Sequence, residues 1–200
     1  NQGTVDFSSG ITLGTATGTG TIELSGSDLV LGGNFTTSST IISGSAGIEF
    51  DGNGTINATD TTIPPVTVSN GASVSVAGIT ASGDKTTIDG NLTINAGSSF
   101  DLGGISSDNF KVTGTVTANG PLALSDGGSN TGLEVGGNLT LGSTFSNEGD
   151  RVIINGSSAQ TISGDFSGDG DNQNGINDNA FAVLEIANTS GGVTAQDSVV

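Results

Sequence analysis

One segment near the C-terminal end of the sequence has the oxygen-rich spacing of a cation-binding loop. Its alternation places Asp165, Ser167 and Asp169 at every second position, with Gly170 next. Calcium takes about six to eight oxygen ligands from a flexible loop, so this pattern predicts a calcium site. The candidate ligands are the oxygen-bearing side chains of Asp165, Ser167, Asp169, Asp171, Gln173, Asn177 and Asp178.

A second interpretation of this segment stays open. Ile176 stands at the twelfth position of the register, where the calcium loop of an EF-hand has a bidentate Glu. Loops rich in Asn, Asp and Gly are common in proteins without any bound ion. The alternative to a calcium site is therefore a solvated polar loop.

The chain lacks most of the side chains on which catalytic sites depend. It has no His, Cys, Tyr or Trp, and its three basic residues, Lys85, Lys111 and Arg151, are far apart and predict no patch. Solenoid enzymes that cleave acidic polysaccharides need clustered carboxylates beside Lys or Arg. With 20 acidic residues, a glycosidase-type carboxylate pair stays open, although the aromatic platforms that stack on sugars are missing. We expect no enzyme, and a carbohydrate-active solenoid enzyme is the least favoured alternative.

Threonines recur in a pattern that could present hydroxyl groups in rows. Thr93, Thr117 and Thr140 each follow a corner glycine. Flat threonine ladders on one face of successive rungs would suit ice binding, but Thr is also a favourable residue on any solvated strand. The uneven spacing weakens the ladder, so an ice- or glycan-binding face is kept as an alternative. Four further threonines alternate and predict an outward row along one strand: Thr15, Thr17, Thr19 and Thr21.

The elements that would position these residues follow from a repeat. A short alternating strand, a tight turn with Gly and a second strand recur, most clearly at 87–94 and 133–141. The spacing of the turn glycines averages about 22 residues, which suits one rung of a β-solenoid with loops of variable length at one corner. Gly fits such a corner because it tolerates positive φ and close backbone approach. These glycines are Gly26, Gly52, Gly71, Gly90, Gly114, Gly137 and Gly156.

We therefore predict an all-β chain that forms one right-handed parallel β-solenoid over residues 1–200, with about seven to eight rungs and a loop insertion at about 164–180. No helix is expected, because Gly is frequent and no helical periodicity occurs. A β-sandwich or a tandem immunoglobulin-like array is the alternative, although aromatic core residues are scarce. The predicted inward residues are Phe50, Ile56, Val68, Val76, Ile88, Leu92, Ile94, Val112, Val116, Leu133, Val135, Leu139, Leu141, Ile154 and Ile162.

The charge of the chain restricts its partners. The net charge is −17, and phosphate binding needs clusters of Lys and Arg, so we expect no nucleic acid partner. No apolar run approaches the ~20 residues of a membrane helix, so no membrane insertion is expected. The segments 4–7 and 197–200 are strand-like, and unprotected strand edges recruit other strands. This predicts self-association end to end or continuation into further solenoid repeats.

Several segments share a similar sequence pattern, including 89–94, 136–141, 156–164 and 184–194. They resemble the repetitive secreted surface proteins and adhesins of Bacteroidetes-type bacteria, and the resemblance extends over most of residues 20–200. It implies export and display at the cell surface, and it supplies no catalytic residues. The expected function is an extracellular structural or adhesive module that forms a stalk or fibre segment. A self-assembling extracellular filament subunit is the alternative.

Overall fold

The computed structural model describes most of the chain as short strands. The described residues are 4–7, 11–13, 16–18, 21–24, 26, 28–37, 42–44, 46–79, 84–103, 110–124, 132–142, 144–147, 150–164 and 181–196. These ranges contain twenty-five strands and no helix, which confirms the all-β prediction. None of their elements is therefore a helix that could cross a membrane.

The strands form four sheets. The nine-stranded sheet consists of β2 (Ile11–Leu13), β5 (Leu29–Leu31), β8 (Ile48–Phe50), β11 (Val66–Val68), β14 (Leu92–Ile94), β17 (Val116–Ala118), β20 (Leu139–Leu141), β23 (Gln160–Gly164) and β25 (Val193–Gln196). The seven-stranded sheet consists of β3 (Ala16–Gly18), β6 (Phe35–Thr37), β9 (Gly54–Asn57), β12 (Ser73–Val76), β15 (Ser99–Asp101), β18 (Leu122–Leu124) and β21 (Phe145–Asn147).

The remaining strands lie on a third side. The three-stranded sheet consists of β1 (Thr4–Phe7), β4 (Thr21–Leu24) and β7 (Ile42–Gly44). The six-stranded sheet follows it along the same side and consists of β10 (Thr61–Ile63), β13 (Thr86–Ile88), β16 (Phe110–Val112), β19 (Gly132–Val135), β22 (Arg151–Ile154) and β24 (Val183–Ile186).

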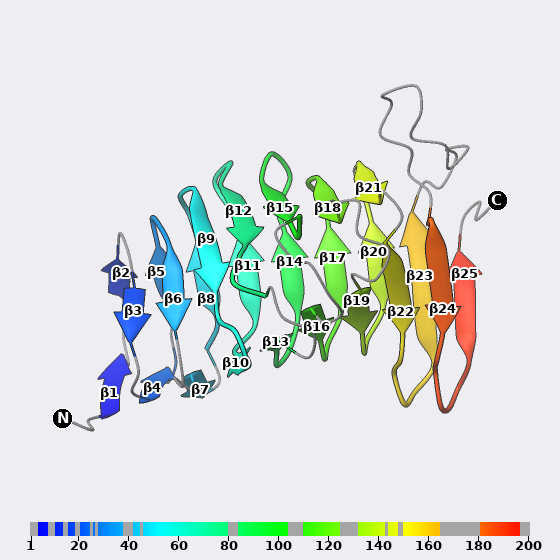
Figure 1. Cartoon of the computed structure of the whole chain (residues 1–200), viewed down its shortest axis with the longest axis horizontal. Helices are drawn as coiled ribbons and strands as arrows, with labels where there is room; N and C mark the ends of the chain where they lie inside the picture. Colours follow the sequence, from blue (N-terminus) through cyan, green and yellow to red (C-terminus); the bar gives the residue numbers. More distant parts are fainter. Residues whose placement is uncertain are drawn as a thin grey trace.

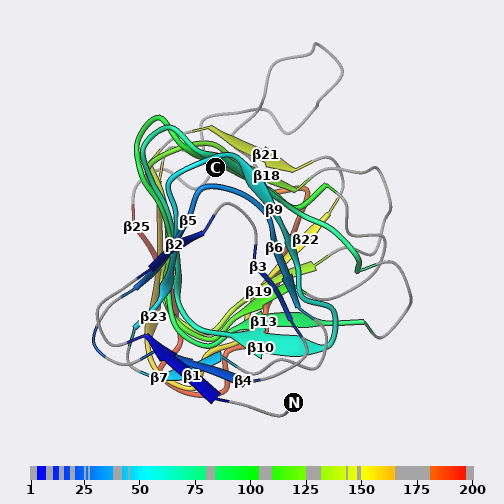
Figure 2. The same cartoon turned by 90° about the vertical axis from the view of Figure 1, so that its left-hand side faces the viewer.

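The strands wind around one axis as a parallel β-solenoid. Each strand pairs in parallel with its equivalent in the next rung, as in the register Val66–Leu92–Val116 of the nine-stranded sheet. Figure 1 shows the rungs side by side along the long axis, and Figure 2 shows the sides enclosing the core. All the pairings between described strands are parallel, whereas a β-sandwich is built from antiparallel sheets. The sandwich alternative is therefore wrong.

The finer parts of the fold prediction are not established by these strands. The sheets contain from three to nine strands, so the described residues do not yield one number of rungs. The predicted seven to eight rungs and the right-handed winding stay predictions.

The core is a column of aliphatic and phenylalanine side chains inside the ring of sheets. Most strands have three residues, of which the first and third are buried and the second faces outward. All fifteen predicted inward residues are confirmed, because each is at most 3% exposed. Phe rings also pack in this column, as in the pair Phe100–Phe110 with ring centroids 5.7 Å apart. Burial in this column is the main source of stability.

The turn glycines occupy two corners rather than the single corner that the repeat suggested. Gly90 and Gly114 lie between the six-stranded and nine-stranded sheets, whereas Gly52 and Gly71 lie between the nine-stranded and seven-stranded sheets. The prediction of one recurring corner is wrong, because both corners need tight turns and both select Gly. Side-chain hydrogen bonds between rungs span from 19 residues, for Gly47, to 34 residues, for Arg151.

Candidate functional site

The predicted calcium segment lies outside the described residues. This applies to all seven candidate ligands, Asp165, Ser167, Asp169, Asp171, Gln173, Asn177 and Asp178. The strands on either side are described: β23 ends at Gly164 in the nine-stranded sheet, and β24 begins at Val183 in the six-stranded sheet. In earlier rungs a strand of the seven-stranded sheet separates these two sheets in the sequence. The segment thus stands at the place in the sequence where earlier rungs have a strand of the seven-stranded sheet.

Elsewhere no alternative metal site competes with this prediction. Among the residues whose placement is described, no three or more acidic side chains converge in a way that could hold a metal ion. The calcium prediction thus concerns residues 165–178 alone, and it stays a prediction.

The three basic residues gather on one side of the solenoid. Lys111 lies on β16, Arg151 on β22, and Lys85 directly before β13, so all three belong to the six-stranded sheet or its edge. Nζ of Lys85 and Nζ of Lys111 lie 3.8 and 3.7 Å from Oε2 of Glu134. Nη1 of Arg151 lies 3.2 Å from Oε2 of Glu185.

The prediction that these cations are isolated is therefore wrong for Lys85 and Lys111, which share Glu134. Lys85 and Lys111 are distant in the sequence but only about one rung apart along the axis, a step of ~4.8 Å. Both ammonium groups are partly exposed, and pairs of this kind contribute only about 0–1 kcal/mol. The cluster therefore places positive charge at one position on an acidic molecule and adds little to its stability.

A shallow polar hollow of about 220 Å³ lies beside this cluster. It is lined by Asp60, Thr61, Thr62, Lys85 and Thr87. The carboxylate of Asp60 accepts a hydrogen bond of 3.1 Å from the backbone N–H of Lys85, which holds the chain before β13. Among the described residues of this lining, Asp60 is the only acidic one, so they do not supply the carboxylate pair of a glycosidase.

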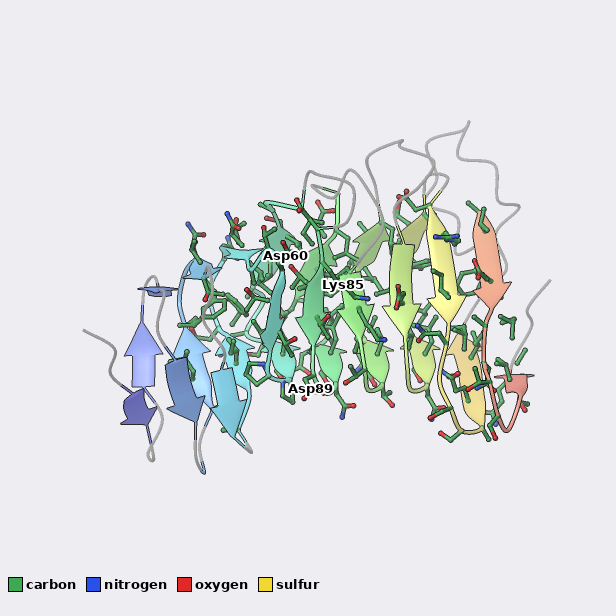
Figure 3. All side chains as sticks on the ribbon, turned by 60° about the horizontal axis from the view of Figure 1, so that its bottom comes forward. Asp60, Lys85 and Asp89 are labelled. Atoms are coloured by element: carbon green, nitrogen blue, oxygen red, sulfur yellow. The ribbon has the colours of Figure 1, made fainter. Side chains whose placement is uncertain are left out.

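The carboxylate that follows the lining residue Thr87 by two positions is directed elsewhere. Asp89 follows β13 and lies at the opposite end of the strand from Lys85, as Figure 3 shows. Its Oδ1 accepts a hydrogen bond of 3.1 Å from Oγ1 of Thr113 in the next rung. Asp89 thus links two rungs at a corner and does not complete a site around the hollow.

A row of threonines stands in register on the nine-stranded sheet. The strands β11, β14, β17 and β20 each have one Thr between two buried residues, and their pairing aligns these threonines. Ser163 of β23 continues the row beyond Thr140, and the two hydroxyl oxygens lie 3.2 Å apart. We call this row the threonine face; its members are Thr67, Thr93, Thr117, Thr140 and Ser163.

The uneven spacing in the sequence did not reveal this register. The extra residues of the longer rungs lie in the connections between sheets, so the strands themselves stay aligned. The other predicted row, from Thr15 to Thr21, is wrong as a single strand. Thr17 lies on β3 and Thr21 on β4, which belong to different sheets, and Thr15 and Thr19 lie outside the described residues.

The last described rung leaves apolar side chains uncovered. Leu184 and Ile186 of β24 align with Val152 and Ile154 of β22, whose side chains are fully buried. They are thus at core positions, yet Ile186 is 52% exposed. The neighbouring strand β25 is equally open. Among the described strands, β24 and β25 are the last of their sheets, so this part of the solenoid combines strand edges without a described partner with an apolar surface.

Comparison with known proteins adds no relative from which a site could be transferred. The chain matches no protein-family model, no curated protein and no solved structure. Three surfaces therefore stand out on geometry alone: the charged cluster of the six-stranded sheet, the threonine face and the open end at β24 and β25.

Proposed function

We propose that the chain is an extracellular structural and adhesive module that forms a stalk or fibre segment of a cell-surface protein. The observation that carries this proposal is the continuous parallel register of the nine-stranded sheet, which extends the molecule along one axis. Such a stack lengthens by adding rungs without changing its cross-section, which is the property that a spacer requires. In this proposal the solenoid is right-handed and has seven to eight rungs.

The surface chemistry agrees with a structural role outside the cell. A net charge of −17 keeps an exposed, repetitive chain soluble and discourages non-specific association through its sides. The described hollow beside Lys85 has a single carboxylate, Asp60, in its lining, and its lysine stands among threonines. We accordingly assign the chain no catalytic activity and no nucleic acid partner.

The open end supplies the connection between segments. Strand edges with uncovered core positions, as at Ile186, bind further strands unless something blocks them. The next rung comes either from continuation of the solenoid or from another copy that docks end to end. Repeated docking of separate copies would make the chain the subunit of an extracellular filament, which is the alternative function.

Electron microscopy combined with light scattering tests this proposal. The isolated chain should form rods of constant width that lengthen as protein concentration rises, and the native material should contain longer rods of the same width. Native filaments built from separate copies would favour the subunit alternative. Compact, strictly monomeric particles at every concentration, together with native material that contains no rods, would overturn the structural role.

A further inference from the structure

The threonine face differs in charge from the side formed by the six-stranded sheet, and its uncharged row ends where Glu49 of β8 stands at the aligned position beside Thr67. Five successive strands of the nine-stranded sheet, β11 to β23, present Thr or Ser at the aligned outward position. At the equivalent positions of the six-stranded sheet stand Lys111, Glu134 and Glu185. In a chain of net charge −17, an uncharged row of this length marks a surface for a neutral ligand.

The threonines are also held in fixed positions. Each lies between two buried core residues, as Thr93 does between Leu92 and Ile94, so its backbone cannot move without opening the core. The β-branched side chain of Thr restricts χ1, which fixes the hydroxyl and the methyl group relative to the sheet. Adjacent backbone is held as well, because Oδ1 of Asn91 accepts a hydrogen bond of 2.9 Å from the N–H of Thr115 in the next rung.

The repeat of this row suits a lattice of water. Neighbouring strands lie ~4.8 Å apart, so hydroxyls and methyls recur at that interval along the axis. This interval is close to the oxygen repeat along the a axis of ice. The hydroxyls can bond to water held at lattice positions, while the methyls cover the apolar surface between them. Figure 1 shows β11, β14, β17 and β20 side by side.

We propose that the threonine face binds ice. The role is independent of the stalk function, since the isolated chain contains the complete row. A crystalline neutral polysaccharide fits the face less well, because sugar-binding surfaces stack sugar rings on aromatic side chains and the chain has no Trp or Tyr. A second copy fits less well because nothing on this face is apolar enough to replace bound water.

The test compares two double variants in ice. Thr93→Tyr/Thr117→Tyr places two neutral rings on adjacent strands of the threonine face, and Thr62→Tyr/Thr87→Tyr places them on adjacent strands of the six-stranded sheet. The wild-type chain should enter a growing ice hemisphere, shape ice crystals and show thermal hysteresis. The first variant should lose all three properties, and the second should keep them. Circular dichroism melts should confirm that both variants fold.

Should the first variant not fold, Thr93→Ser/Thr117→Ser removes two methyl groups with little effect on packing and should reduce the hysteresis. The proposal fails if wild-type protein is excluded from ice, or if both tyrosine variants lose hysteresis equally. It also fails if the first variant instead loses retention on crystalline cellulose or loses a concentration-dependent dimer. Those results would assign the face to a polysaccharide or to a second copy. Rod formation in the electron microscope should be the same for every variant.

Discussion

Gly114 shows how closely consecutive rungs approach at the corner between the six-stranded and nine-stranded sheets. Its N–H donates a hydrogen bond of 2.8 Å to the carbonyl of Gly90, and its own carbonyl accepts one of 2.8 Å from Gly137. A methyl group added at Gly114 would lie 2.6 Å from the carbonyl carbon of Gly90. Three glycine backbones thus stack directly on one another, and no side chain fits between them.

We expect Gly114→Ala to lower the free energy of unfolding by about 1–3 kcal/mol, because the added methyl forces the rungs apart. Gly132→Ala is the matched control, since a methyl there would be 3.6 Å from its nearest neighbour, an ordinary contact. The control should change the free energy by less than about 1 kcal/mol. Urea unfolding followed by circular dichroism measures both. Equal effects of the two substitutions would contradict the close stacking of the glycines.

Gln160 is a residue whose role the sequence does not reveal. It is 2% exposed, and its Oε1 accepts a hydrogen bond of 2.7 Å from the N–H of Gly156. Its Nε2 donates one of 3.2 Å to the carbonyl of Val135 in the preceding rung, and Oε1 also accepts one of 2.7 Å from Asn188. The amide can be buried because it is fully hydrogen-bonded. Its partners come from three rungs, so only the three-dimensional register brings them together.

At the scale of strands, the alternation of apolar and polar residues predicts where the strands lie in the sequence. It does not predict how neighbouring strands align with one another. Bursts such as Val66–Val68 and Leu92–Ile94 have buried first and third residues as predicted, because a period of two is a local property of the backbone. The register between strands of successive rungs depends on the number of residues in each corner. That number is not a local property of the strand sequence. This is why the contact of Lys85 and Lys111 with Glu134 and the alignment of the threonine face could not be predicted.

The calcium prediction for the segment between β23 and β24 can be tested by adding calcium and by removing the charge of one candidate ligand. If residues 165–178 bind calcium only in the folded chain, millimolar calcium at fixed ionic strength should raise the melting temperature. Calcium at one hundred times its dissociation constant stabilises by about 2.7 kcal/mol. Asp169→Asn should diminish the shift, because it removes one candidate ligand charge.

Asp51→Asn is the matched control for that substitution. It removes the same charge from a described residue just after β8, on another part of the solenoid, and should leave the calcium shift intact. A melting temperature that calcium does not change would leave residues 165–178 as a solvated loop. The same shift in both variants would show that calcium acts on the overall charge.

On the scale of the whole molecule, charge divides the surface into distinct sides. The cations stand at the six-stranded sheet, the threonine face is neutral, and the excess of acidic residues makes lateral contacts between copies repulsive. Contact between copies is therefore favoured at the ends, where backbone pairing and apolar burial can act together. Salt should strengthen such contacts, because it screens the repulsion.

We expect Ile186→Lys to abolish end-to-end association, because it places a charge over the core at the open end. Val183→Lys is a closely matched control: the two residues share β24 and are 52% and 47% exposed. Val183 aligns with Arg151 on the outward side of the strand rather than with the core. The control should associate like wild type in sedimentation velocity experiments across a concentration series. Equal loss in both variants would point to net charge instead of the apolar end.

The parallel stacking also determines how the molecule responds to tension. The first and last described strands, β1 and β25, lie at opposite ends of the long axis, and the hydrogen bonds between strands run along that axis (Figure 1). A pull on both ends therefore loads a terminal rung first and detaches it before the next rung bears the force. Each rung of ~22 residues would release about 70 Å of chain. A stalk built in this way yields stepwise and keeps its remaining rungs intact, so it lengthens under a sudden load instead of breaking.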